Sequence, residues 1–107
     1  MVTRPLLAMA VALIGLLVAA PTAQADATDQ KFLAALKEQG IVDQASSQHA
    51  IEAGHYVCVR LDNGQTPSDV MQEVLHSSSL TEFHTGYFVA ESIYAYCPRH
   101  LGEAPKS

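Results

Sequence analysis

The sequence predicts an all-α protein: a small bundle of about four helices with one disulfide, preceded by a signal peptide. Beyond residue 25, apolar residues recur at the three- and four-residue spacings of helices, and no segment alternates like a half-buried strand. The chain contains two cysteines, an even number that an exported protein can pair. Its first 25 residues have the three-part layout of a secretory signal.

Residues 1–25 form the predicted signal peptide. Arg4 supplies a positive charge, residues 6–20 are apolar, and small residues precede a cleavage site expected between Ala25 and Asp26. As a helix the apolar run is roughly 22 Å long, which is shorter than the ~30 Å hydrocarbon core of a bilayer. A cleaved signal is therefore favoured over an uncleaved membrane tether. The protein is expected to be secreted, extracellular or in the cell envelope, with no stable membrane anchor after cleavage.

The predicted mature chain, residues 26–107, is short enough to form a single helical domain with an ordered core over about 29–98. Cleavage removes Arg4 but none of the eleven carboxylates, so five Lys and Arg residues remain and the formal net charge becomes −6. Such an acidic surface repels phosphate groups, and no nucleic acid or anionic membrane is expected as a partner.

The first helix is expected over about Asp29–Gln39. Gly40 can adopt the left-handed conformation that closes a helix, and Ile41 is then placed to fold back onto the last turn. The apolar face predicted for this helix consists of Phe32, Leu33 and Leu36.

The second helix is expected over about Ser47–Leu61, closed by Asn63 and Gly64. Gly54 lies on its apolar face, where a glycine is costly for a helix, so a close crossing by a neighbouring helix is expected there. The predicted inner face consists of Ile51, Gly54, Cys58 and Leu61.

The third helix has strong start signals: Thr66 as the cap, Pro67 at the first helical position and Asp69 in the first turn. It is expected to end at the serine run 77–79. The fourth begins at Thr81 and stops before Pro98. The inner faces predicted for these helices are Val70, Met71, Val74 and Leu75 in the third, and Phe83, Tyr87, Ala90, Tyr94 and Cys97 in the fourth.

Both cysteines fall on predicted apolar faces, at the last turns of the second and fourth helices. Two cysteines allow a single pairing, and an oxidising compartment favours the Cys58–Cys97 disulfide. Closing a loop of about forty residues contributes about 4 kcal/mol in the chain-entropy model. A reactive or metal-binding thiol is the alternative.

Three groups of residues resemble one known family. They are Asp29, Phe32, Leu33, Leu36, Gly40 and Ile41; then Val57, Cys58, Leu61, Asp62 and Gly64; and finally Ala95, Tyr96, Cys97 and Pro98. Together they are similar to the small secreted actinobacterial, chiefly mycobacterial, proteins of domain-of-unknown-function family 732. The resemblance covers about 29–98 and implies a helical fold, export and paired cysteines. It implies no activity and no catalytic residues.

No catalytic constellation is found, so an enzyme is not expected: a Gly-x-Ser-x-Gly elbow and glycine-rich phosphate loops are both absent from the sequence. No cofactor is expected either. His49, Glu52 and His55 recur every three residues on the second helix and are a candidate metal site. They span about 120° around the helix, which is wide for one ion, and the alternative is that they are solvated surface residues. His76, His84 and His100 are expected at the surface.

Tyr87 and Tyr94 lie on the predicted inner face of the fourth helix. Core packing is the simpler interpretation, and the alternative is that these aromatic residues line a pocket for a small apolar or haem-like ligand. Because the sequence indicates export and shows no catalytic site, the leading functional hypothesis is a secreted protein-interaction module with an unknown protein partner. The alternative is a carrier of a small apolar or haem-like ligand.

Overall fold

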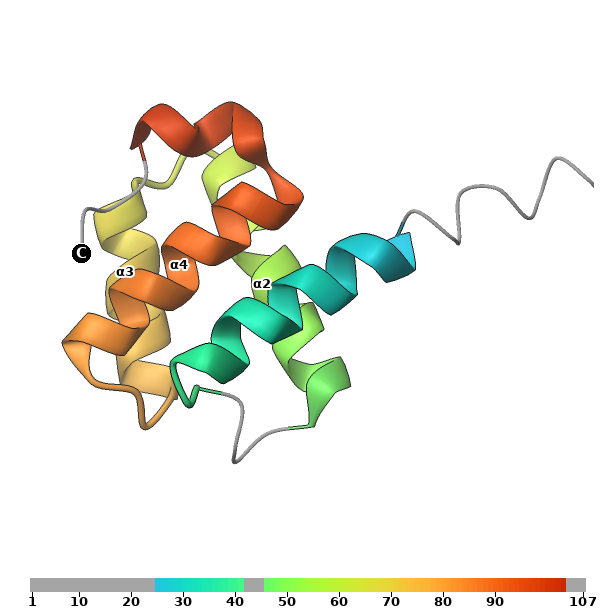
Figure 1. The fold of residues 1–107 in the computed structure, drawn as a ribbon. Coiled ribbons are helices and arrows are strands. Elements are labelled where there is room, and N and C mark those ends of the chain that lie inside the picture. The colour runs from blue at the N-terminus through green and yellow to red at the C-terminus, as the bar shows by residue number, and fades with distance from the viewer. Residues whose placement is uncertain (1–24, 42–45, 104–107) are drawn as a thin grey trace, which may run out of the picture.

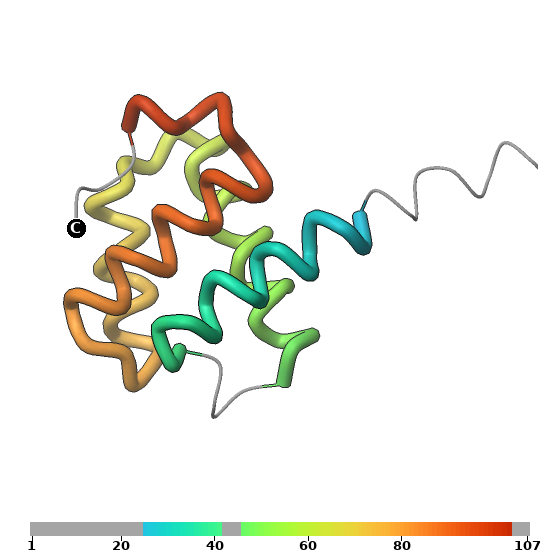
Figure 2. Tube along the Cα trace, viewed as in Figure 1, coloured from blue at the N-terminus to red at the C-terminus, as the bar shows by residue number. Residues whose placement is uncertain are grey.

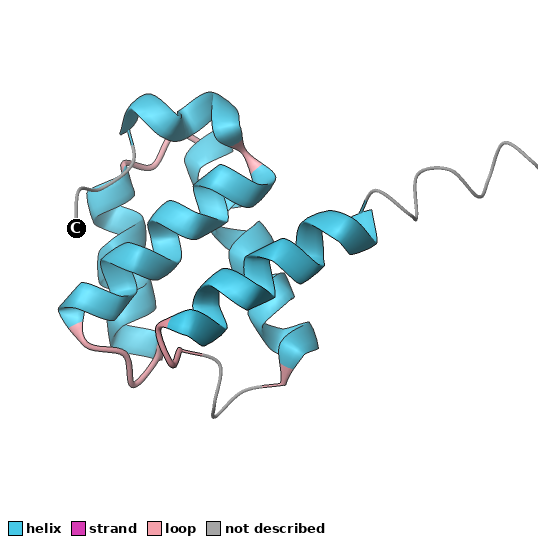
Figure 3. Cartoon of the chain, in the orientation of Figure 1, coloured by secondary structure: helices cyan, strands magenta, loops and turns pink. Residues whose placement is uncertain are grey.

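The computed structural model describes residues 25–41 and 46–103. These residues form an N-terminal helix (residues 25–38), α2 (Ser47–Asp62), α3 (Pro67–Ser77), α4 (Glu82–Tyr96) and a short 3₁₀ helix, η1 (Pro98–Glu103). No strand occurs within the two described ranges (Figure 3). The predicted all-α fold with four main helices is confirmed, whereas residues 1–24 of the predicted signal peptide lie outside the described residues.

The helices pack around a central pair, α2 and α4. Helix α3 packs mainly on α4, and the N-terminal helix crosses in front of α2 in the view of Figures 1 and 2. The Cys58–Cys97 disulfide joins the end of α2 to the end of α4, with the two Cα atoms 5.8 Å apart. The predicted pairing of the two cysteines is therefore confirmed.

One hydrophobic core is shared by the N-terminal helix and the three helices that follow. Phe32 lies near its centre, with its ring centroid 5.1 Å from that of Tyr96 and 6.0 Å from that of Phe88. The buried apolar side chains are Phe32, Leu36, Ala50, Val57, Cys58, Leu61, Val70, Phe88, Val89, Ile93 and Cys97.

The helix ends follow the local signals in the sequence. Gly40 (φ 70°) and Gly64 (φ 94°) are left-handed, and both close their helices with the same hydrogen-bond pattern. After the N-terminal helix, the Ile41 amide donates to the Leu36 carbonyl oxygen at 3.0 Å, so that Ile41 folds back as predicted. Thr66 caps α3 by accepting a hydrogen bond from the Asp69 amide at 3.1 Å.

The start predicted for the first helix was wrong, because the N-terminal helix already includes residues 25–28. Alanine is the best helix former, and acidic residues such as Asp26 are favourable in a first turn, so nothing local delays the helix. A tertiary contact directly follows this segment, where the Tyr96 hydroxyl donates a hydrogen bond to Asp29. At the other end of the chain, η1 extends the ordered structure beyond the predicted limit at residue 98.

The inner face predicted for the fourth helix was right at Cys97, which is buried, and in part at Tyr87, which packs against the core, but it was wrong at Phe83 and Tyr94. Phe83 and Tyr94 are 55% and 67% exposed, and the buried side of α4 is rotated away from them. Two of its buried residues, Thr85 and Ser92, donate hydroxyl hydrogen bonds to the carbonyl oxygens four residues earlier, each at 2.8 Å. Burial is tolerable for these polar groups because they are satisfied within the helix. The buried side consists of Thr85, Gly86, Phe88, Val89, Ser92 and Ile93.

The predicted close crossing at Gly54 is confirmed. A Cβ atom at this position would lie 2.8 Å from Cζ of Phe32 and 3.0 Å from Cε2 of Tyr96. By contrast, a Cβ atom at Gly86 would meet Cε of Met71 at 3.5 Å, an ordinary contact distance.

The two helical glycines therefore predict opposite effects of the same substitution. Gly54→Ala gains about 1 kcal/mol of helix propensity but forces two packed rings to move, and we expect a net loss of about 1 kcal/mol in the free energy of unfolding. Gly86→Ala is the matched control and is expected to gain about 1 kcal/mol. Urea denaturation of both variants measures the difference, and a stabilised Gly54→Ala variant would contradict the tight crossing.

Candidate functional site

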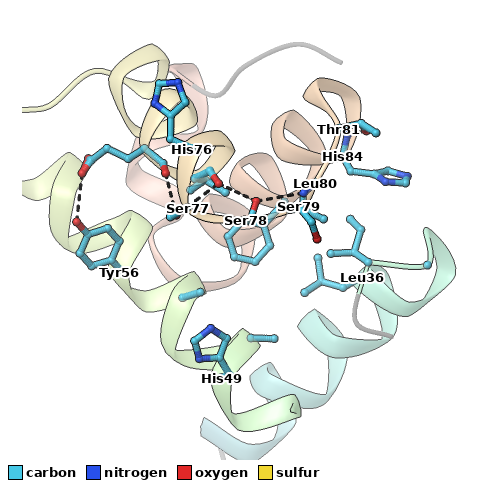
Figure 4. Close-up of a pocket in the computed structure, with 17 residues that line it drawn as sticks. Leu36, His49, Tyr56, His76, Ser77, Ser78, Ser79, Leu80, Thr81 and His84 are labelled. Atoms are coloured by element: carbon cyan, nitrogen blue, oxygen red, sulfur yellow. Dashed lines mark hydrogen bonds between the residues drawn. The ribbon is translucent and has the colours of Figure 1, made fainter. Parts of the chain in front are cut away.

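An open groove with a volume of about 1000 Å³ lies among the residues that the structure describes. It lies where the end of the N-terminal helix, the first half of α2, the end of α3 and the start of α4 meet, as Figure 4 shows. Ligand pockets typically have volumes of about 300–1,000 Å³, so the groove is large enough for a small molecule.

The floor of the groove is apolar. Buried Leu36 and Phe88 lie at its base, while Ile41, Val74 and Leu80 are only partly buried although they pack against the core. These three side chains belong to the hydrophobic cluster, yet each leaves surface open toward the groove. An apolar occupant would remove that surface from water, at about 25 cal/mol per Å².

The rim of the groove is polar. It includes Glu73, whose two carboxylate oxygens are both engaged: one accepts a hydrogen bond from the Tyr56 hydroxyl at 3.2 Å, and the other pairs with Nε of Arg60 at 3.3 Å (Figure 4 draws the Tyr56 bond). His49, His76 and His84 stand on three sides of the groove, on α2, α3 and α4. The groove thus combines an apolar floor with imidazole groups at its edge.

The serine run after α3 shapes one end of the groove. The hydroxyls of Ser77 and Ser78 donate to the carbonyl oxygens of Glu73 and Val74 at 2.8 and 2.7 Å, and Ser78 Oγ accepts a hydrogen bond from the Leu80 amide. These bonds end α3 and turn the chain toward α4. The hydroxyl protons of Ser77 and Ser78 are therefore used inside the turn.

A family model described as "Protein of unknown function (DUF732)" matches residues 28–99. The chain belongs to this family. It is 36% identical over 97 residues to the uncharacterized protein Rv1271c of Mycobacterium tuberculosis (strain ATCC 25618 / H37Rv), covering 90% of this chain and 85% of that protein. The uncharacterized protein Mb1323c of Mycobacterium bovis is 34% identical over 82 residues, covering 77% and 73%. No solved structure matches the chain.

The candidate metal residues are not gathered into a site. Among the residues that the structure describes, no group of three His, Cys, Asp or Glu side chains is arranged to hold a metal ion. The His55 ring instead packs against Tyr96, with the centroids 3.9 Å apart, while His49 lies at the groove and Glu52 is exposed. Their three-residue spacing spreads them around α2, as the 100° turn per residue requires.

The tyrosines singled out in the sequence do not line the groove. Tyr87 is half-buried, and its hydroxyl donates to the Ala35 carbonyl oxygen at 3.4 Å. Burial, together with the nearby charges of Glu91 and Glu38, raises the pKa of Tyr87. Tyr94 is exposed and lies at a smaller recess of about 330 Å³ between α4 and the N-terminal helix. The core packing expected for both residues is therefore seen only in part at Tyr87, and the alternative, a pocket lined by both, is not formed because only Tyr94 borders this recess.

One ion-pair cluster was not found by sequence reasoning. Asp62, at the end of α2, accepts two hydrogen bonds from Arg99 and a third, at 2.9 Å, from Nε2 of His100, whose Nδ1 lies 2.9 Å from Glu103. These groups fasten η1 to α2 beside the disulfide. His100, which was expected to be a solvated surface residue, is therefore a structural contact.

The cluster predicts a stability maximum in mildly acidic solution. Hydrogen bonds from Arg99 and His100 lower the pKa of Asp62 below 3.8. The contribution of Asp62 to the free energy of unfolding is therefore present above pH 3.8 and is lost as the pH falls through the lowered pKa. Hydrogen bonds to Glu103 and Asp62 raise the pKa of His100 above 6.5. The contribution of His100 to the free energy of unfolding is therefore present below pH 6.5 and is lost as the pH rises through the raised pKa.

Both contributions are complete only between the two ordinary values, 3.8 and 6.5. Melting temperatures measured across this range and above it check the alkaline side of the profile. His100→Gln should remove the decline above pH 6.5 that this cluster causes, while His55→Gln, outside the cluster, should keep it. An identical profile for the protein and His100→Gln would contradict the role given to His100.

No helix among the described residues is long and apolar enough to cross a membrane.

Proposed function

We propose that the protein is exported from the cell and acts as a binding protein that carries a small apolar ligand in the groove. The supporting observation is the groove itself, with a ligand-sized volume and an apolar floor of incompletely buried core side chains. Membership of a family of unknown function gives no activity to transfer. The proposal therefore rests on geometry and on the secretory layout of residues 1–25.

Binding without catalysis fits the groove better than an enzymatic role. General acid–base and nucleophilic chemistry need side chains held within hydrogen-bond reach of each other. Around the described part of the groove, the carboxylate of Glu73 is held by Arg60 and Tyr56, and the hydroxyls of Ser77 and Ser78 are held by backbone carbonyls. These groups are thus occupied, and the groove offers mainly shape and apolar surface with imidazole groups at its edge, which suits a carrier.

A secreted protein-interaction module is the second candidate. It is favoured by five large apolar side chains that are about half exposed or more: Tyr56, Val59, Phe83, Tyr94 and Leu101. They lie on α2, α4 and η1, and singly exposed apolar residues are common on monomeric proteins. The groove, in contrast, concentrates apolar surface in one concave place, which favours the carrier.

Native mass spectrometry tests the proposal on protein exported by its own organism and purified without detergent. We expect a species heavier than the polypeptide that loses the extra mass on denaturation. The Ala53→Trp variant, which places an indole into the groove from α2, should lose the bound mass. Ala34→Trp, on the exposed side of the N-terminal helix, is the matched control and should retain it. A bare polypeptide mass in every sample would contradict a carrier.

A further inference from the structure

The five histidines of the chain divide into two sets. His55 packs against the Tyr96 ring, and His100 is bonded to Asp62 and Glu103, so both serve internal contacts. The other three, His49, His76 and His84, all line the groove. Within residues 25–41 and 46–103, none of these three rings forms a hydrogen bond to another side chain.

The groove also differs from the rest of the molecule in charge. The chain carries eleven carboxylates and a formal net charge of −5, so most of its surface repels anions. Among the described residues that line the groove, Glu73 is the single carboxylate, and Arg60 pairs with it. The edge of the groove is thus a place where an acidic protein presents imidazole groups, which can donate hydrogen bonds to an anionic head group.

From these two features we infer that the ligand is a long-chain fatty acid, with its hydrocarbon chain on the apolar floor and its carboxylate at the imidazole rim. This inference rests on the proposed carrier function and adds the chemistry of the head group. The apolar floor accounts for the chain, because Ile41, Val74 and Leu80 gain burial from it. The imidazoles account for the carboxylate, because hydrogen bonds from a charged or polarised donor to a carboxylate are stronger than neutral ones.

Other single-chain amphiphiles fit one part of the groove but not both. A long-chain alcohol matches the floor and offers a neutral hydroxyl to the rim. A long-chain quaternary ammonium ion matches the floor, but its head group has no lone pair and cannot accept a hydrogen bond from the imidazoles. The three head groups therefore separate the contribution of the rim from that of the floor.

The test is titration calorimetry of the exported protein at about pH 6 with dodecanoate, dodecanol and dodecyltrimethylammonium, with the two ionic ligands kept below their micelle concentrations and dodecanol below its solubility limit. Dodecanoate is expected to bind about tenfold more tightly than dodecanol, which corresponds to one charge-assisted hydrogen bond. The ammonium ion is expected to bind more weakly than the alcohol. Equal affinity for all three, or preference for the ammonium ion, would overturn the fatty-acid inference while leaving an apolar carrier in place.

Variants separate this inference from the proposed function. The triple variant His49→Gln/His76→Gln/His84→Gln should lose the preference for dodecanoate but still bind dodecanol, whereas His55→Gln, an imidazole outside the groove, should keep the preference. Ala53→Trp should weaken all three ligands, and Ala34→Trp should weaken none. If none of the three binds the folded protein, carrier and fatty acid fail together. If the triple variant keeps the full preference, only the role of the rim fails. Melting temperatures confirm that each variant is folded.

Discussion

Replacing Cys58 and Cys97 together with alanine is expected to lower the free energy of unfolding by about 4 kcal/mol. The disulfide closes a loop with a sequence separation of 39 residues, and the entropy of the unfolded chain rises when that loop is opened. Small domains have total stabilities of about 5–15 kcal/mol, so the change removes a large fraction. The bridge also joins the ends of the two central helices, at a point where Cys97 is completely buried.

Urea denaturation in the absence of reductant measures this effect. Val59→Ala is a control on the same helix: Val59 is adjacent to Cys58 but 53% exposed, so its truncation should change stability by less than about 0.5 kcal/mol. Reduction of the unmutated protein should reproduce most of the loss. An unchanged denaturation midpoint for the double variant would show that helix packing alone holds α2 to α4.

Phe32→Ala is expected to cost about 3–5 kcal/mol, the range for removing a fully buried aromatic side chain. Phe32 is 2% exposed, and its ring contacts Phe88 and Tyr96 on α4 while lying over Gly54 on α2. The ring therefore fixes the N-terminal helix to both central helices. Its removal should leave a cavity that the crossing at Gly54 cannot close.

The matched control for this substitution is Phe83→Ala, which removes the same atoms from a side chain that is 55% exposed. We expect it to change stability by about 0.5 kcal/mol or less. Chemical denaturation of the two variants side by side also tests the orientation of α4. A large loss in Phe83→Ala with a small one in Phe32→Ala would mean that the buried face of α4 is the one first suggested by its aromatic spacing.

The parts of the fold that depend on neighbouring residues could be predicted from the sequence. Thr66 and Pro67 start α3, and Gly40 and Gly64 end two helices, because caps and left-handed residues act through bonds to the backbone a few residues away. The cysteine pairing was also predictable, since two cysteines allow one bridge.

The orientation of α4 could not be read from periodicity alone, since this helix carries apolar residues on more than one side. Its exposed Phe83 and Tyr94 resemble core residues by type, while buried Thr85 and Ser92 resemble surface residues. The latter two can be buried because their hydroxyls donate hydrogen bonds within the helix. The spacing of hydrophobic residues contains no information about such bonds.

The groove could not be found from the sequence because its walls come from four separate elements. His49, His76 and His84 are 27 and 8 residues apart and meet only through the packing of α2, α3 and α4. The contact between Asp62 and His100 is equally distant along the chain. Helical spacing groups His49 with His55. It gives no sign that His49 shares a groove with His76 and His84.

Titration of the ¹⁵N-labelled protein with dodecanoate, followed by amide chemical shifts, shows where on the fold this ligand binds. We expect the largest shift changes at groove residues on all of its walls, among them Ile41, Ala53, Val74 and Leu80. The chemical shifts of amides near the smaller recess at Tyr94 should not change. Saturating shifts confined to that recess, or no shifts at the groove, would contradict the assignment of the groove as the ligand site.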